Sequence, residues 1–307
     1  MQYIVPDYYD EFSCIKGECK HNCCIGWEID IDSDTAELYK SVTGDFGKRL
    51  YKSVSNDDVP HFILGKDERC PFLNSENLCD IILELGEECL CDICAEHPRF
   101  TNEFDDRIEK GLGLCCEAAA RLILSREKPV VLLGDTGTDD EIILLRDRII
   151  SALQQREKSI LKRLGEALSL CGKPKTEYDI EKWTEKLLSL ERLDDEWADR
   201  LNLLKNGIKT ANFADFDLYM DSRQTEYEQL AVYLVYRHFA NTDKIEAATT
   251  RLRFAEFAVM LIRAIGAVTW TENEKFSTDD YIEIARMFSS EIEYSDENLG
   301  LILEWLK

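Results

Sequence analysis

The residues of this chain that could do chemistry are above all its cysteines. Twelve cysteines occur among 307 residues, and eleven of them fall between Cys14 and Cys116, with Cys171 alone beyond. Thiolate is a soft ligand that suits zinc and iron–sulfur clusters, and four sulfurs complete either kind of site. In a reducing cytosol such density indicates metal ligation, whereas in a secreted chain it would indicate disulfide bonds. We therefore expect a cysteine-ligated metal centre in the first third of the chain.

The number and spacing of the thiols leave the kind of centre open. Eleven cysteines exceed one tetrahedral zinc ion, so a [4Fe–4S] cluster, two sites, or one site plus buried free thiols are all possible. The thiols form two groups, first Cys14-x4-Cys19-x3-Cys23-Cys24 and then Cys70, Cys79, Cys89-x-Cys91-x2-Cys94 and Cys115-Cys116. Adjacent cysteines do not easily take equivalent positions. In the Cys23-Cys24 pair, either one thiol ligates while the other packs, or each serves a different iron. His21 and His97 either add a ligand or are surface or core residues.

Two familiar catalytic motifs are missing from the sequence. A radical S-adenosylmethionine enzyme needs C-x3-C-x2-C, and after Cys19 and Cys23 the third position holds Gly26. A methyltransferase of the dinucleotide-binding type needs a glycine-rich turn between a strand and a helix. The nearest candidate, residues 132–137, lacks that alternation, so we interpret it as a loop.

The charge of the chain restricts its partners. Against 37 Lys and Arg stand 61 Asp and Glu, a formal net charge of -24, which repels nucleic acid and anionic lipid and attracts basic proteins. The chain starts without a basic segment and apolar core typical of a signal peptide, and no stretch approaches the roughly 18 apolar residues of a membrane helix. We therefore expect a cytoplasmic protein that binds neither nucleic acid nor membrane.

The elements that position these residues differ between the two parts of the chain. Glycine and proline punctuate the first part, as is typical of a domain folded around its ligands, and from about Asp139 onward the apolar spacing is helical. The sequence predicts a mainly α fold, with an irregular cysteine-rich metal-binding domain at residues 1–127 followed by a helical bundle at residues 128–307. The expected helices span residues 34–54, 116–126, 139–170, 179–190, 196–205, 222–239, 245–270, 278–292 and 296–305, and residues 27–31 alternate like a strand. We interpret the aromatic residues of the bundle, including Tyr233 and Tyr236, as core.

Several of these motifs resemble, in order and spacing, those of the flagellin lysine N-methylase family, which is related to cysteine-rich zinc- or iron-chelating proteins. The resemblance is carried by Cys14 to Asp32, Cys70-Pro71-Phe72-Leu73, Leu78 to Ile81, Leu85-Gly86-Glu87, Leu90, Cys94, His97-Pro98-Arg99 and Leu114 to Leu122. The run from Tyr227 to Arg237 resembles the family's helical region, so the resemblance covers most of the chain.

The resemblance implies an enzyme that transfers a methyl group from S-adenosylmethionine to lysine ε-amines of flagellin and is associated with an iron–sulfur cluster. It implies metal ligands at the family's cysteine positions, which in this chain are Cys14, Cys19, Cys23, Cys24, Cys70, Cys79, Cys94 and Cys115. Cys89, Cys91 and Cys116 are peculiar to this chain, and Cys116 stands where the family usually has proline. The chain is also shorter at its C-terminus than many members, which leaves open a metal-binding relative without methylase activity.

Methylating an amine requires a neutral lysine beside an electrophilic methyl group, and carboxylates or tyrosine hydroxyls can take the proton. Candidate site residues in that scheme are Glu28, Asp30 and Asp32 beside the cysteine loop, Arg99, and Glu117 after Cys116. The alternative interpretation is that these residues are structural. The three acids would then be exposed charges on a strand, Arg99 would form a salt bridge, and Glu117 would be a carboxylate at the start of a helix. Two non-enzymatic functions also stay open: a zinc or iron–sulfur module that stabilises the fold or senses oxidation, and an acidic scaffold for a basic partner.

Overall fold

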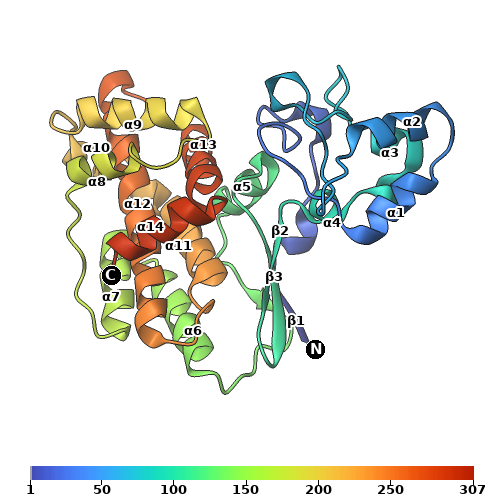
Figure 1. The fold of residues 1–307 in the computed structure, drawn as a ribbon. Coiled ribbons are helices and arrows are strands. Elements are labelled where there is room, and N and C mark those ends of the chain that lie inside the picture. Colours follow the sequence, from blue (N-terminus) through green and yellow to red (C-terminus); the bar gives the residue numbers. More distant parts are fainter. Residues whose placement is uncertain (1) are drawn as a thin grey trace. The chain divides into compact units, whose positions relative to one another are not determined.

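The computed structural model describes residues 2–307, which separate into two compact units (Figure 1). The cysteine-rich unit comprises residues 13–100, and the helical unit comprises residues 2–12 together with residues 101–307. The sequence placed this boundary after residue 127. Residues 101–127 group with the helices because they supply two strands of a sheet and helix α5 (Glu117–Leu124), which packs against the helical unit.

The cysteine-rich unit is built from short elements. Its helices are α1 (Ser33–Ser41), α2 (Gly44–Ser53), α3 (Asp80–Leu85) and α4 (Asp92–Glu96), with 3-10 turns at Lys16–Glu18, Lys66–Glu68 and Glu87–Cys89. Asp32 fixes two of these helices, since its carboxylate accepts the Thr35 N–H at the start of α1 (2.9 Å) and the Asp92 N–H at the start of α4 (3.0 Å). Burial alone would raise the pKa of Asp32, but these backbone hydrogen bonds hold it below its ordinary value. The sequence analysis considered Asp32 as a site residue, and the structure uses it as a helix cap.

The core of this unit is small and contains two of the thiols. Its buried members are Ile29, Ile31, Ala36, Tyr39, Leu50, Phe62, Cys70, Phe72, Leu73, Ile81 and Cys91. The alternation at residues 27–31 correctly predicts which side chains turn inward, because Ile29 and Ile31 are buried while Asp30 faces out. However, this segment forms only an isolated bridge with His61, not a strand.

The predicted helix at residues 34–54 is interrupted in the structure. It ends after Ser41 and begins again at Gly44, whose φ of 83° favours glycine. Apolar residues on both sides of the break, such as Tyr39 and Leu50, still reach one core. The spacing of apolar residues therefore gave no indication that the helix is interrupted between Ser41 and Gly44.

The helical unit begins with a four-stranded sheet in the order β2-β3-β1-β4. The strands are β1 (Gln2–Pro6), β2 (Arg99–Glu103), β3 (Arg107–Leu112) and β4 (Leu132–Leu133). β1 runs parallel to β3, with Tyr3 opposite Ile108, and antiparallel to β4, with Val5 opposite Leu133 (Figure 1). The run at residues 132–137 thus contains a two-residue strand, where the sequence predicted a loop. Gly134 has a φ of 116° and passes so close to the Tyr3 carbonyl that a Cβ would lie 2.4 Å from it.

The remaining helices follow one another along the rest of the chain. They are α6 (Glu141–Leu153), α7 (Ile160–Leu170), α8 (Ile180–Leu187), α9 (Asp195–Gly207), α10 (Phe213–Tyr219), α11 (Gln224–His238), α12 (Ile245–Asn273), α13 (Thr278–Phe288) and α14 (Asp296–Trp305). A π-helical turn at Ser289–Glu293 extends α13. α11 and α12 pack against each other and are buried along most of their length, so they form the centre of the unit.

The expected mainly α fold is confirmed. The predicted helix at residues 139–170 is divided between α6 and α7, because Gln154 ends the first and Ser159 precedes the second. Among residues 2–307, no helix has both the length and the apolar composition needed to cross a bilayer.

Candidate metal centre and buried polar network

The cysteine-rich unit brings together thiols from four segments of the chain. Cys24 and Cys70 are joined through their backbones, since the Cys70 N–H donates to the Cys24 carbonyl (2.8 Å). Cys79 directly precedes α3, and an isolated bridge pairs it with Leu73. Cys91 directly precedes α4, and Cys94 lies on its first turn. The six thiols that interact electrostatically here, which we call the thiol cluster, are Cys23, Cys24, Cys70, Cys79, Cys91 and Cys94.

Burial, or a hydrogen bond to a neighbouring thiol, raises the pKa of four of these six thiols above the ordinary value. Burial raises the pKa of Cys70 to about 11 and also raises that of Cys79. A hydrogen bond with Cys23 is the largest cause that raises the pKa of Cys24, and the same bond lowers that of Cys23 to about 7. Cys91 and Cys94 form a second pair of this kind, in which the pKa of Cys91 is lowered. Because thiolates are the metal-binding form, a cation that binds here must release protons.

The surroundings of the thiol cluster are apolar. Cys70 and Cys91 are core residues, and Cys24, Cys79, Cys89 and Cys94 pack against the same core. The Tyr39 hydroxyl donates to the Cys89 carbonyl (2.8 Å), and burial followed by the nearby thiols raises its pKa. Among residues 2–307, no three cysteine sulfurs lie within 4.8 Å of one another.

Of the other predicted ligands, Cys14 and Cys19 belong to the cysteine-rich unit and Cys115 does not. Cys14 is exposed and its sulfur accepts the Lys16 N–H (3.3 Å). Cys19 ends the 3-10 turn at Lys16–Glu18, and Cys115 belongs to the helical unit. Conversely, Cys91 joins the cluster although the sequence analysis did not count it as a ligand. The sequence did contain a signal for Cys91, because the spacing Cys91-x2-Cys94 lets two thiols meet across one helical turn.

The acidic and basic candidates lie at different places. Glu28 and Asp30 lie beside His61, with the His61 Nε2 atom 3.3 Å from Glu28. Arg99 begins β2 and is half-buried, and Glu117 occupies the first position of α5 and is also half-buried. The structure therefore groups Glu28 with Asp30 and does not bring either into the thiol cluster. Burial lowers the pKa of His97 to about 4, and its ring lies 6.4 Å from that of Trp27.

The helical unit contains a buried polar network that the sequence analysis missed. Glu293 is the centre of this network and is removed from solvent. Its carboxylate lies 2.6 Å from Nε2 of His238 and accepts the Tyr233 hydroxyl proton (3.1 Å). Arg237 donates to the Tyr233 oxygen (2.7 Å) and lies 3.5 Å from the same carboxylate. Burial alone would raise the pKa of Glu293, but Arg237 and His238 hold it below its ordinary value.

The network reaches the surface through Tyr294. The Arg237 guanidinium carbon lies 4.7 Å from the centre of the Tyr294 ring, and the Tyr294 hydroxyl hydrogen-bonds the Cys115 thiol. Tyr294 is 43% exposed, whereas the adjacent Glu293 is buried. The π-helical turn produces this arrangement, because the Tyr294 N–H bonds to the Ser289 carbonyl five residues earlier (3.2 Å). Such turns are frequent at functional sites.

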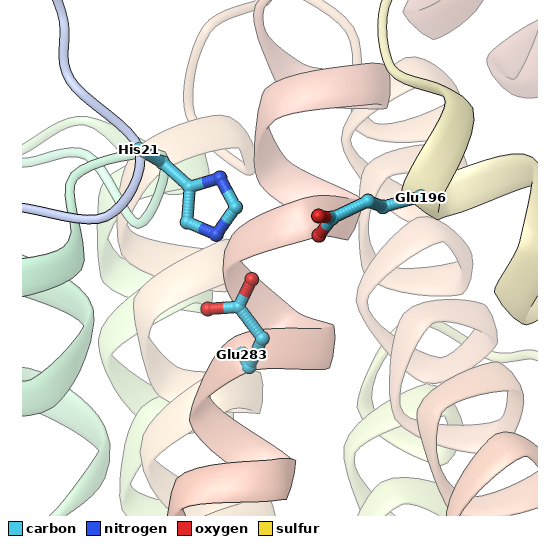
Figure 2. A group of neighbouring side chains, drawn as sticks. All are labelled: His21, Glu196 and Glu283. Atoms are coloured by element: carbon cyan, nitrogen blue, oxygen red, sulfur yellow. The ribbon is translucent and has the colours of Figure 1, made fainter.

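Two further carboxylates of the helical unit face each other. Figure 2 shows Glu196, on α9, and Glu283, on α13, with their carboxylates turned toward each other. One carboxylate oxygen of each lies within 4.8 Å of the other. Glu283 also pairs with Arg286 (2.8 Å). His21, the third residue labelled in Figure 2, belongs to the cysteine-rich unit.

A comparison with known proteins finds a family that matches the part of the chain containing the buried network. Residues 180–307 match the FliB lysine N-methylase C-terminal domain. The expected resemblance to the flagellin lysine N-methylase family is confirmed. The matched residues 180–307 include Tyr233, Arg237, His238, Glu293 and Tyr294.

Relatives of known name support the same assignment. The flagellar biosynthetic protein FliU of Salmonella muenchen is 25% identical over 167 residues, which cover 50% of this chain and 92% of that protein. The lysine-N-methylases of Salmonella typhimurium and Salmonella choleraesuis are 26% and 25% identical over 145 residues, 43% of this chain and 34% of each methylase. The match thus spans about a third of the length of these two methylases. No solved structure matches the chain.

Proposed function

We propose that this protein is a lysine N-methyltransferase that transfers a methyl group from S-adenosylmethionine to lysine ε-amines of flagellin. The observation that carries the proposal is the match of residues 180–307 to a lysine N-methylase domain. The buried network centred on Glu293 lies within that match and reaches solvent at Tyr294. Fixed polar groups behind a partly exposed tyrosine side chain are the arrangement expected of an acceptor site.

Tyr294 is the residue proposed to meet the substrate lysine. Burial raises the pKa of Tyr294, so the hydroxyl is neutral and can accept a hydrogen bond from the ε-amine. The Arg237 guanidinium beside its ring disfavours a second cation and so favours the uncharged amine. Glu293 and Tyr233 do not touch the substrate in this scheme. They hold Arg237 in place and are positioning residues.

The reaction needs a neutral lysine, which first gives up its ammonium proton to solvent. The nitrogen lone pair then forms the new N–C bond while the S–C bond breaks and its electron pair stays on sulfur. When bound, S-adenosylmethionine supplies the electrophilic methyl group. The contribution of the protein is alignment, since holding the amine in a fixed orientation converts a bimolecular step into an effectively unimolecular one.

We also propose that the thiol cluster holds an iron–sulfur centre. One thiol of the Cys23-Cys24 pair, Cys70, Cys79, and one thiol of the Cys91–Cys94 pair would supply its four ligands. Soft sulfur donors in apolar surroundings fit such a cluster. When bound, the cluster would cross-link the four segments of a unit whose own core is small.

The proposal places the protein in the cytoplasm, where thiols stay reduced and flagellin is accessible before export. The formal net charge of -24 favours association with a lysine-bearing partner. An anaerobic preparation should be analysed for iron, sulfide and zinc per chain and titrated with S-adenosylmethionine by calorimetry. Iron with sulfide and saturable donor binding would support the proposal. Zinc alone, without heat from the donor, would instead indicate a structural metal module.

A further inference from the structure

A second group of possible metal ligands lies on the cysteine-rich unit, outside the thiol cluster. Glu28, Asp30 and His61 each offer a ligand atom, and these atoms lie within 4.8 Å of one another. The Nε2 atom of His61 lies 3.3 Å from the Glu28 carboxylate and 3.8 Å from the Asp57 carboxylate. The Nε2 atom of His61 therefore lies close to two acidic side chains, and Asp30 lies beside the same group.

The backbone fixes this group in place. Asp30 and His61 are opposite each other in an antiparallel bridge, flanked by the hydrogen bonds from Ile31 N–H to Pro60 (2.7 Å) and from Phe62 N–H to Ile29 (3.1 Å). Ile29 is buried in the core, and alternation along an extended segment turns Glu28 and Asp30 to the other side. The carboxylates consequently project from a segment that is anchored by its apolar neighbours.

The other nitrogen of His61 has its own partners. Nδ1 lies 3.1 Å from the Ser55 hydroxyl and 3.3 Å from the Val59 carbonyl oxygen. In the tautomer with its proton on Nδ1, that proton bonds to the Val59 carbonyl oxygen, whereas in the other tautomer Nδ1 accepts the Ser55 hydroxyl proton. The first tautomer leaves the Nε2 lone pair beside the carboxylates, and it is the form that can bind a cation together with them. Metal-bound histidines in proteins are commonly held by a carbonyl in this way.

We propose that Glu28, Asp30 and His61, with Asp57 at the edge, bind a divalent first-row transition-metal ion. Carboxylates with one imidazole suit ions such as Mn²⁺ or Fe²⁺, whereas the thiol cluster favours softer centres. The bound ion would join residues 28–30 to the loop that ends at His61. This site is independent of the proposed methyl transfer, and failure of either proposal leaves the other intact.

Manganese is the probe that separates the two sites, because thiolates select softer metals. The full chain, purified anaerobically with its own cysteine-bound centre, should be titrated with Mn²⁺ and followed by the electron paramagnetic resonance signal of the free ion. Pulsed measurements on the bound ion report coupling to an imidazole nitrogen. The matched variants are His61→Ala, Glu28→Gln with Asp30→Asn, and Asp58→Asn, which removes a neighbouring acid outside the group.

The site predicts one bound Mn²⁺ per chain with imidazole nitrogen coupling. His61→Ala should lose that coupling and weaken binding by at least about tenfold, as should the Glu28→Gln, Asp30→Asn pair, while Asp58→Asn binds as the parent chain does. Circular dichroism of each variant checks that it is folded. Equal affinity in His61→Ala and Asp58→Asn would show only diffuse attraction to an acidic surface and would overturn the assignment. Absence of Mn²⁺ binding would overturn it as well.

Discussion

The Nε2 atom of His238 lies 2.6 Å from the Glu293 carboxylate, and both residues are withdrawn from solvent. Replacing Glu293 by Gln leaves the charge of Arg237 without its buried counterpart. Breaking a buried pair in this way costs about 3–5 kcal/mol of the free energy of unfolding. Urea denaturation measures the loss, and Glu272→Gln, at an exposed site on α12, should change stability by less than about 0.5 kcal/mol. Equal stability of the two variants would contradict the role assigned to the network.

Tyr294 should affect methyl transfer more than folding, because its side chain is partly exposed. Tyr294→Phe removes only the hydroxyl that is proposed to orient the substrate amine. We expect kcat to fall by about 10²-fold with little change in KM, the magnitude typical of losing one positioned polar group. Tyr51→Phe, at a side chain that is 73% exposed on α2, is the control. A Tyr294→Phe enzyme with unchanged kcat would remove Tyr294 from the proposed acceptor site.

Glu291 should make stability depend on pH in a defined window. Its carboxylate accepts N–H groups from Leu193 and Asp194, yet burial dominates and raises its pKa from 4.5 to about 6. An acid with a raised folded-state pKa stabilises the fold below the unfolded pKa and loses that contribution as pH rises through the folded pKa. We expect a loss of about 2 kcal/mol between pH 4.5 and 6.

The matching experiment compares the parent chain with Glu291→Gln by urea denaturation at several pH values. Glutamine cannot ionise, so its stability should lack the fall between pH 4.5 and 6 that the parent shows. Parallel curves for the two proteins would rule out Glu291 as the source of the pH dependence.

The thiol cluster predicts which cysteines matter for the metal. Cys70→Ser or Cys79→Ser should remove most of the iron and sulfide from an anaerobic preparation, because each supplies a ligand with no adjacent thiol to replace it. Cys171→Ser should keep both, since Cys171 ends α7 in the helical unit. Single replacement of Cys23 or Cys24 should have a smaller effect, because the neighbouring thiol remains. Metal content that is indifferent to Cys70 and Cys79 would contradict the proposed ligand set.

Sequence periodicity predicted the long elements better than their interruptions. The helix at residues 296–305 has the predicted bounds in the structure, and α12 begins at the predicted Ile245. The break between α6 and α7 was missed because Leu153 and Ile160 are seven residues apart and both buried, so apolar spacing continues across it. The sheet was missed because β1 pairs with residues more than 100 positions away.

The sequence predicted candidate site residues only where the residue type itself implies a chemistry, as it does for cysteine. Cysteine density indicated a metal centre in the first third of the chain, and Cys70, Cys79 and Cys94 do converge with Cys24. Sequence alone could not separate Cys14 from this group, since spacing does not show where a loop turns. The Glu293 network was missed because Tyr233 fits the helical core pattern, and only the fold shows that its hydroxyl has a buried carboxylate partner. The signal available in the sequence was Glu293 itself, a glutamate at a position where the helical spacing predicts a core residue.

Methyl transfer itself is the most direct test of the central claim. Flagellin should be incubated with the anaerobically purified protein and S-adenosylmethionine carrying a labelled methyl group, and the lysines then mapped by mass spectrometry. The account predicts labelled N-methyllysine that requires both protein and donor and is strongly reduced with Tyr294→Phe. Unmodified flagellin, in a reaction where the protein is folded and carries its metal, would contradict the account.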